Sequence, residues 1–247
     1  MSTRTRLRAV HVRVLALLAR DISARCTTEP TLVLAPHPDD ETIGCGGVIA
    51  RKRAVGTPVR VVIAADGGDA ARRAECLEAC RRLGVADDSV HFLGLPDGHL
   101  AEHRAELESA LADALGACPT QVFVPSAIDA HPDHRALAAA VDDLPADALR
   151  GIEVLAYPIW FWNRWAWVDR TTPPWRQRLQ LLWRPLRQLV GTRVVSVDTS
   201  ATLAQQRAAL DAHHSQVTPD DGSSGLDRNW LGTFLRSPAV FFVVRAR

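Results

Sequence analysis

The stretch Thr31-Leu32-Val33-Leu34-Ala35-Pro36-His37-Pro38-Asp39-Asp40-Glu41 carries the clearest structural signal in the chain. It begins as an apolar run of strand length and ends in a polar loop, which leads into the helix-like residues 42–55. The same order recurs, because the apolar run at residues 59–65 ends at Asp66-Gly67-Gly68 and residues 70–83 have helical composition. Strands that alternate with helices in this way predict a parallel sheet.

The pattern continues along the chain. Apolar runs at residues 90–93, 121–125 and 152–157 predict further strands, and residues 102–115 predict a helix between two of them. The sequence therefore predicts an α/β fold with a Rossmann-like, doubly wound, mostly parallel sheet. In such sheets the crossovers are right-handed, and ligands bind at the carboxyl ends of the strands.

Length and segment composition predict the domain organisation. A chain of 247 residues commonly forms one large α/β domain. Residues 1–29 are expected to form an N-terminal amphipathic helix, because arginines interrupt an apolar run too short to span a membrane. Residues 30–247 are expected to form a single α/β hydrolase domain, with a Trp-rich insertion at about residues 158–192. Six of the seven tryptophans lie in that insertion: Trp160, Trp162, Trp165, Trp167, Trp175 and Trp183.

Overall composition excludes several classes of protein. With 47% hydrophobic and 23% charged residues, the chain has the balance of a soluble globular protein. A net charge of +1 gives no whole-protein field for nucleic acid, so the expected partner is a small-molecule or glycoconjugate substrate. Five scattered cysteines favour a reducing, cytoplasmic location, and Cys76 and Cys80 are expected to be buried packing residues. A homo-oligomer is compatible with the sequence.

Two distant clusters carry residues that bind metals. His37 and Asp40 lie three apart after the first predicted strand, and His131-Pro132-Asp133-His134 follows the strand at residues 121–125. Both clusters should therefore lie on the same rim of the sheet. A catalytic zinc takes three protein ligands of these types and keeps one position open. Iron, manganese and cobalt accept the same ligands.

Each residue also has a structural interpretation. Asp39 or Asp40 alone could be a helix N-cap, and His134 alone could pack. The adjacent acids repel one another unless a cation or a helix N-terminus neutralises them. Two clusters at equivalent strand ends favour the metal interpretation, in which one acid binds metal while its neighbour acts on water.

The two clusters resemble the signature motifs of the LmbE-like, or PIG-L, deacetylases. Weaker matches follow in the family's order, so that the resemblance covers roughly residues 30–216. These matches are Asp66-Gly67, Arg72 and Glu75 before Leu83-Gly84-Val85, Leu95-Pro96-Asp97-Gly98, and Ala209-Leu210 before His213, Ser215 and Gln216.

The resemblance implies a zinc ion held by His37, Asp40 and His134. It implies Asp39 as the general base, and a protonated His131 that stabilises the oxyanion. It further implies an N-acetylglucosamine-type conjugate as substrate.

The resemblance also suggests residues that contact the substrate. Arg72 matches a substrate-contacting position, and Asp66 and Asp97 are candidates for binding sugar hydroxyls, although Asp-Gly is also a turn signal. The resemblance does not explain the Trp-rich segment, from which Trp160 or Trp162 is expected near the mouth of the site, where an aromatic face can stack on a sugar.

Two other functions stay open from the sequence. One is an amidase that cleaves a larger acyl or thiol-conjugate amide at the same metal. The other is a non-catalytic, metal-dependent glycan-binding protein. A nucleotide-binding Rossmann protein is disfavoured, because the first strand leads into His-Pro-Asp-Asp and not into a Gly-rich phosphate turn.

Overall fold

A computed structural model describes residues 14–117, 119–162, 172–189, 192–217, 226 and 228–247. Its centre is an eight-stranded sheet in the order β1-β7-β8-β6-β5-β2-β3-β4. The strands are β1 (Arg20–Asp21), β2 (Thr31–Ala35), β3 (Val59–Ala65), β4 (Val90–Leu95), β5 (Gln121–Pro125), β6 (Glu153–Tyr157), β7 (Val194–Val197) and β8 (Ala239–Arg245).

The sheet is mostly parallel, as the alternating pattern predicts. Only β8 among the described strands runs antiparallel, to β6 on one side and β7 on the other. Val33 of β2 lies opposite Val61 of β3 and Phe123 of β5. The strand order reverses between β2 and β5, so the crevice at their carboxyl ends is the topological switch point at which α/β sheets bind ligands.

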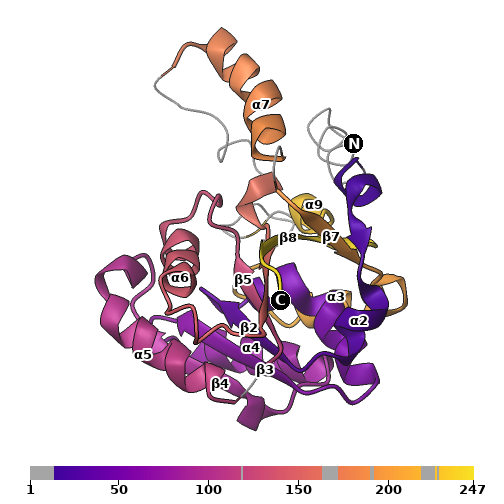
Figure 1. The fold of residues 1–247 in the computed structure, drawn as a ribbon. Helices are drawn as coiled ribbons and strands as arrows, with labels where there is room; N and C mark the ends of the chain where they lie inside the picture. The colour runs from indigo at the N-terminus through magenta and orange to yellow at the C-terminus, as the bar shows by residue number, and fades with distance from the viewer. Residues whose placement is uncertain (1–13, 118, 163–171, 190–191, 218–225, 227) are drawn as a thin grey trace.

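Helices cover both faces of the sheet (Figure 1). One apolar cluster contains Ile49 of α3, Cys80 of α4 and Leu210 of α8. The opposite cluster contains Leu107 of α5 and Leu137 of α6. The α-helices are α2 (Ser23–Thr28), α3 (Asp40–Ala54), α4 (Ala70–Arg82), α5 (Arg104–Leu115), α6 (Pro132–Asp142), α7 (Pro174–Leu189), α8 (Leu203–Leu210) and α9 (Arg228–Leu231). Short 3₁₀ turns are η1 (Asp87–Ser89), η2 (Leu100–Glu102), η3 (Trp160–Trp162) and η5 (Ser200–Thr202).

Alternation along β2 explains the two layers. Val33 and Ala35 belong to the cluster on the α3 side, whereas Leu32 and Leu34 belong to the opposite cluster. A strand buried on both faces reads as a continuous apolar run, which is the signal that the sequence shows. The doubly wound α/β prediction is therefore confirmed.

Helix α3 lies unusually close to the sheet. A Cβ atom at Gly44 would overlap the Tyr157 ring, so a larger residue there would push the helix away. The Tyr157 hydroxyl in turn donates to the carbonyl of Leu34 at 2.7 Å. These contacts fix the first turn of α3 against the ends of β2 and β6.

The N-terminal segment differs from the single helix expected over residues 1–29. Residues 14–18 are helical, but Arg20–Asp21 then form β1 alongside β7, and Ser23–Thr28 form α2. The segment thus joins the sheet, because its backbone pairs with a strand distant in sequence. Residues 1–13 lie outside the described part.

The Trp-rich segment is partly described. It contributes η3 and the long helix α7, while residues 163–171, with Trp165 and Trp167, lie outside the described part. Among the described residues, no helix is both long and apolar enough to cross a membrane. The four described cysteines are buried free thiols, as expected for Cys76 and Cys80.

Candidate metal centre and substrate pocket

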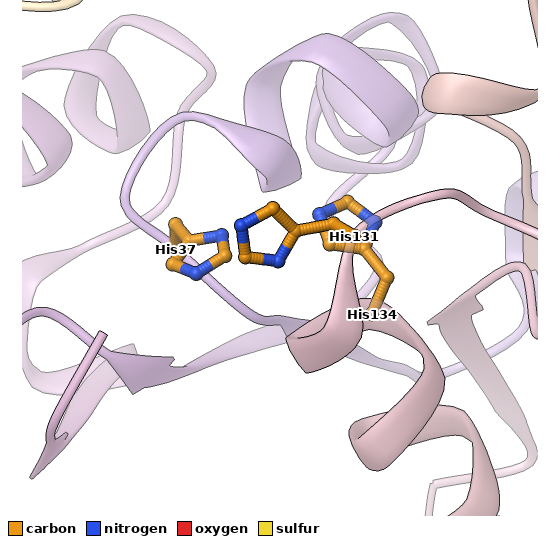
Figure 2. A group of neighbouring side chains, drawn as sticks. All are labelled: His37, His131 and His134. Atoms are coloured by element: carbon orange, nitrogen blue, oxygen red, sulfur yellow. The ribbon is translucent and has the colours of Figure 1, made fainter. Parts of the chain in front are cut away.

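The two predicted clusters meet at the switch point of the sheet. His37 lies in the loop after β2, and Asp40 is the first residue of α3. His131 is the N-cap of α6, and His134 lies in the first turn of that helix. Figure 2 shows the three histidine rings facing one another, and the centroids of His37 and His131 are 4.7 Å apart. Each of the three rings offers a nitrogen within 4.8 Å of the others.

Two distances within the set of His37, Asp40 and His134 suit a tetrahedral metal ion. Asp40 Oδ2 lies 3.2 Å from His37 Nδ1 and 3.2 Å from His134 Nε2. Ligand atoms at zinc distances are separated by about 3.3–3.6 Å in a tetrahedral site. His134 Nε2 is buried and has no hydrogen-bond partner, although it faces the carboxylate. A buried nitrogen without a partner is costly, and a metal ion would satisfy it.

Both histidines of this set are oriented by a second carboxylate. Asp129 Oδ2 lies 3.0 Å from His134 Nδ1, and Asp129 also accepts the backbone N–H groups of Ile159 and Phe161 at 3.1 and 2.9 Å. Asp133 Oδ2 lies 3.0 Å from His37 Nε2. Metal-binding histidines are usually held in this way, by a carboxylate on the other ring nitrogen.

The carboxylates favour positive charge at the two rings. Burial opposes protonation of His37, but hydrogen bonds to Asp133 and Asp40 outweigh it and raise the pKa of His37 to about 12. Burial likewise opposes protonation of His134, but the charge of Asp40 and the hydrogen bond to Asp129 raise its pKa to about 9. A bound divalent cation would satisfy the same negative charges that stabilise these protons.

His131 differs from the other two rings. Its Nδ1 accepts the backbone N–H of Asp133 at 3.2 Å, so the neutral ring carries its proton on Nε2. Burial and the positive charges of His37 and His134 lower the pKa of His131. The lowered pKa favours a neutral ring with an N–H donor over the protonated imidazole that the family resemblance implies. A neutral donor can still bind an oxyanion.

Asp39 has a strained backbone beside the metal set. Its φ of 134° lies where side chains are rarely found, and its side chain makes no capping hydrogen bond. Its N–H donates to Glu41 Oε2 at 2.9 Å, and the carboxylate of Glu41 is fully buried. Burial and the negative charge of Asp40 raise the pKa of Asp39 to about 7. The N-cap interpretation of the Asp39 side chain is thus wrong, and strain of this kind concentrates at functional sites.

A pocket opens over the cluster. Arg72 and Asp97, which the sequence predicted as substrate contacts, both line this pocket. Arg72 Nη1 lies 3.2 Å from Asp97 Oδ2, and Asp97 Oδ1 lies 3.1 Å from His37 Nε2. Trp160 also lines the pocket and stacks on Trp230, with centroids 4.9 Å apart. The lining residues are His37, Asp39, Asp40, Ile43, Arg72, Asp97, His131, His134, Ile159, Trp160, Gln216, Leu226 and Trp230.

Asp66 is not among the residues that line this pocket. Its carboxylate is fully buried, is bonded to Arg73 and accepts the N–H of Gly68 at 3.2 Å. The turn interpretation of Asp66-Gly67 therefore describes the structure better than sugar binding does.

Sequence reasoning missed two residues of the site. Asp129 lies in the loop between β5 and α6, and its role depends on backbone groups 30 and 32 residues away. Trp230 is the one tryptophan outside the predicted insertion, and it reaches the pocket from α9. The order of residues gave no signal for either contact.

The chain is similar in sequence to proteins of known family. The PIG-L family, described as GlcNAc-PI de-N-acetylase, matches residues 32–144. A 1D-myo-inositol 2-acetamido-2-deoxy-alpha-D-glucopyranoside deacetylase from Nocardia farcinica is 32% identical to this chain, and the match covers 76% of this chain and 80% of that protein. The chain belongs to the PIG-L family. The family resemblance predicted from the two motifs is thereby confirmed.

Two further comparisons are with a second curated protein and with a solved structure. A probable N-acetyl-alpha-D-glucosaminyl L-malate deacetylase 2 from Bacillus subtilis is 32% identical to this chain, and the match covers 46% of this chain and 59% of that protein. The crystal structure of a conserved protein from Thermus thermophilus has a TM-score of 0.53 and 29% identity, covering 76% of this chain and 80% of its own. The two chains therefore share their fold over most of their length.

Proposed function

We propose that this PIG-L protein is a zinc-dependent hydrolase that removes the N-acetyl group from an N-acetylglucosamine-type conjugate. The observation that carries the proposal is the approach of two histidine nitrogens to one carboxylate oxygen. His37 Nδ1 and His134 Nε2 each lie 3.2 Å from Asp40 Oδ2, and the buried His134 Nε2 makes no hydrogen bond. The two curated relatives described above are named as deacetylases of N-acetylated glucosamine conjugates, which supports the substrate class.

His37, Asp40 and His134 would hold the ion. When bound, zinc supplies a Lewis acid that activates water and polarises the acyl oxygen. Asp39 removes a proton from the attacking water, and its raised pKa of about 7 suits a base that works near neutral pH. The same carboxyl group then returns the proton to the leaving amine. The Nε2–H of His131 donates to the oxygen on which negative charge develops.

The pocket wall would orient the sugar. The Trp160–Trp230 stack offers an aromatic face beside the metal set, and sugar rings pack well on such faces. Arg72 and Asp97 offer a donor and an acceptor for sugar hydroxyls. Asp66 has no place in this proposal, because its carboxylate is held by Arg73.

Acetate release from a panel of N-acetylglucosaminyl conjugates tests the proposal. The zinc-loaded protein should release acetate, and Asp39→Asn should lower kcat by about 10²–10⁴-fold while its zinc content is unchanged. Asp69→Asn is the matched control, because Asp69 is the N-cap of α4 and lies outside the pocket lining. Full activity of Asp39→Asn would contradict the assignment of the base.

The same panel separates the other functions. Long-acyl and thiol-conjugate amides that turn over faster than acetyl substrates would favour the broader amidase. Zinc-dependent glycan binding without any released product would favour a binding protein. A cytoplasmic location and a homo-oligomer stay predictions, which fractionation of cells and the measured molecular mass would check.

A further inference from the structure

Helix α7 exposes a row of large apolar side chains. Trp175 is 58% exposed, Leu179 is 51% exposed and Trp183 is 45% exposed. These residues are spaced by four, so they lie on one face of the helix. Scattered exposed apolar residues are normal, but an aligned set with two tryptophans marks an interaction surface.

Two neighbouring residues of α7 depart from the pattern of ordinary surface helices. A helix that packs on its own domain buries its apolar stripe and exposes its polar face. In α7, the polar Gln180 is 9% exposed while its neighbour Leu179 is 51% exposed. Figure 1 shows α7 projecting from the rest of the fold. The apolar stripe is therefore presented away from the core.

The charge of this region differs from that of the rest of the chain. Residues 170–193 contain six arginines and residues 1–20 contain five, and neither segment contains an acidic residue. The remaining residues carry 18 basic side chains against 28 acidic ones. The chain thus has a near-zero net charge but contains two strongly basic segments. Their positive charge is complementary to that of an anionic partner.

The described parts of these two segments lead into neighbouring strands. Strand β1 pairs in parallel with β7, with Arg20 opposite Val195. The helical residues 14–18 lead into β1, and α7 precedes β7, so both segments enter neighbouring strands from the same end of the sheet. Leu17 and Leu18 are 84% and 71% exposed. They add exposed apolar side chains at the end of the sheet where β1 begins.

We propose that α7 and residues 14–18 form a docking face for an anionic phospholipid bilayer. The helix would lie in the plane of the interface, with Trp175, Leu179 and Trp183 inserted at the boundary between headgroups and acyl chains. Tryptophan favours that depth, and basic amphipathic helices with an apolar face bind there.

The arginines beside the tryptophans are placed for the lipid phosphates. The guanidinium of Arg176 lies 5.1 Å from the centroid of the Trp175 ring, and that of Arg184 lies 5.8 Å from the Trp183 ring. When the rings reach the interface, these cations are at headgroup depth, where a guanidinium can bind phosphate through two hydrogen bonds. This inference concerns location and does not depend on the proposed deacetylase activity.

Co-sedimentation of the full chain with vesicles tests the inference. We expect the protein to bind phosphatidylcholine vesicles that contain phosphatidylglycerol, and to bind pure phosphatidylcholine vesicles much more weakly. Arg176→Gln with Arg184→Gln should lower the partition coefficient about 30-fold. Arg150→Gln with Arg207→Gln is the charge-matched control, because both residues are exposed elsewhere on the fold, and it should leave the partition coefficient unchanged.

The apolar stripe needs its own variant. Trp175→Ser with Leu179→Ser and Trp183→Ser should abolish binding, whereas Val55→Ser with Val244→Ser, which alters two exposed residues elsewhere, should not. Thermal unfolding of each variant checks that the fold is kept. Equal vesicle binding by the stripe variant and the wild type would overturn the inference. Two other results would also overturn it: no vesicle binding at low salt, or a stripe that mediates only self-association or nucleic-acid binding.

Discussion

The strained backbone of Asp39 predicts that Asp39→Gly leaves the metal-free protein more stable than Asp39→Ala does. Both variants should lose activity. At a φ of 134° a Cβ atom is unfavourable, and the residue keeps this conformation because Glu41 holds its N–H. Strain of this kind costs about 1–3 kcal/mol. Asp39→Ala removes the carboxylate but keeps the Cβ atom, whereas Asp39→Gly removes both. The glycine variant should therefore be the more stable of the two.

A control is needed because glycine is also better than alanine at a helix N-cap. Asp69 is the N-cap of α4, has an ordinary φ of −72° and accepts the N–H groups of Ala71 and Arg72. There, glycine should exceed alanine only by the capping preference, which is about 1 kcal/mol or less. At Asp39 the difference between glycine and alanine should be larger than at Asp69 by about 1–3 kcal/mol, which is the relieved strain.

Urea unfolding of the four variants, in the presence of a chelator, measures this difference. For a chain of this length, 1 kcal/mol corresponds to about 2–4 °C in Tm, so thermal unfolding is an adequate second assay. Both Asp39 variants should lose acetate release despite their different stabilities. If the glycine–alanine difference at Asp39 is no larger than at Asp69, the argument from backbone strain is refuted.

Two further predictions concern the surroundings of the metal set. Asp129→Asn should weaken zinc binding about 10–100-fold in a competition with a chromogenic chelator, because His134 loses a charged partner. Asp142→Asn, at an exposed position of α6, should leave zinc binding unchanged. Equal losses in the two variants would contradict the orienting role of Asp129. Arg72→Ala should raise KM about 10–100-fold with little change in kcat, because one hydrogen bond from a charged group to substrate is lost; a fall in kcat alone would place Arg72 in the chemical step.

Local sequence patterns predicted the centre of the fold well. Strands β2, β3, β5 and β6 are buried on both faces, so each appears as an apolar run bounded by turn residues. The candidate metal ligands could be predicted from the sequence for the same reason. Both clusters follow directly from such strands, and parallel topology brings strand ends together.

Long-range contacts account for what the sequence could not predict. Strand β1 is two residues long and exists because β7 pairs with it, so no local periodicity marks it. The pocket position of Trp230 depends on stacking with Trp160, 70 residues earlier in the chain. The lowered pKa of His131 depends on burial and on the charges of two other rings. These features follow from the assembled fold and not from any one segment.

Titration of metal-stripped protein with zinc, followed by acetate release from an N-acetylglucosaminyl conjugate, tests the central claim most directly. The account predicts that activity rises from zero and reaches its maximum at one equivalent of zinc. His134→Ala should show no such rise at one equivalent, because it lacks the nitrogen that faces Asp40. Full acetate release by the stripped protein in excess chelator would contradict the account.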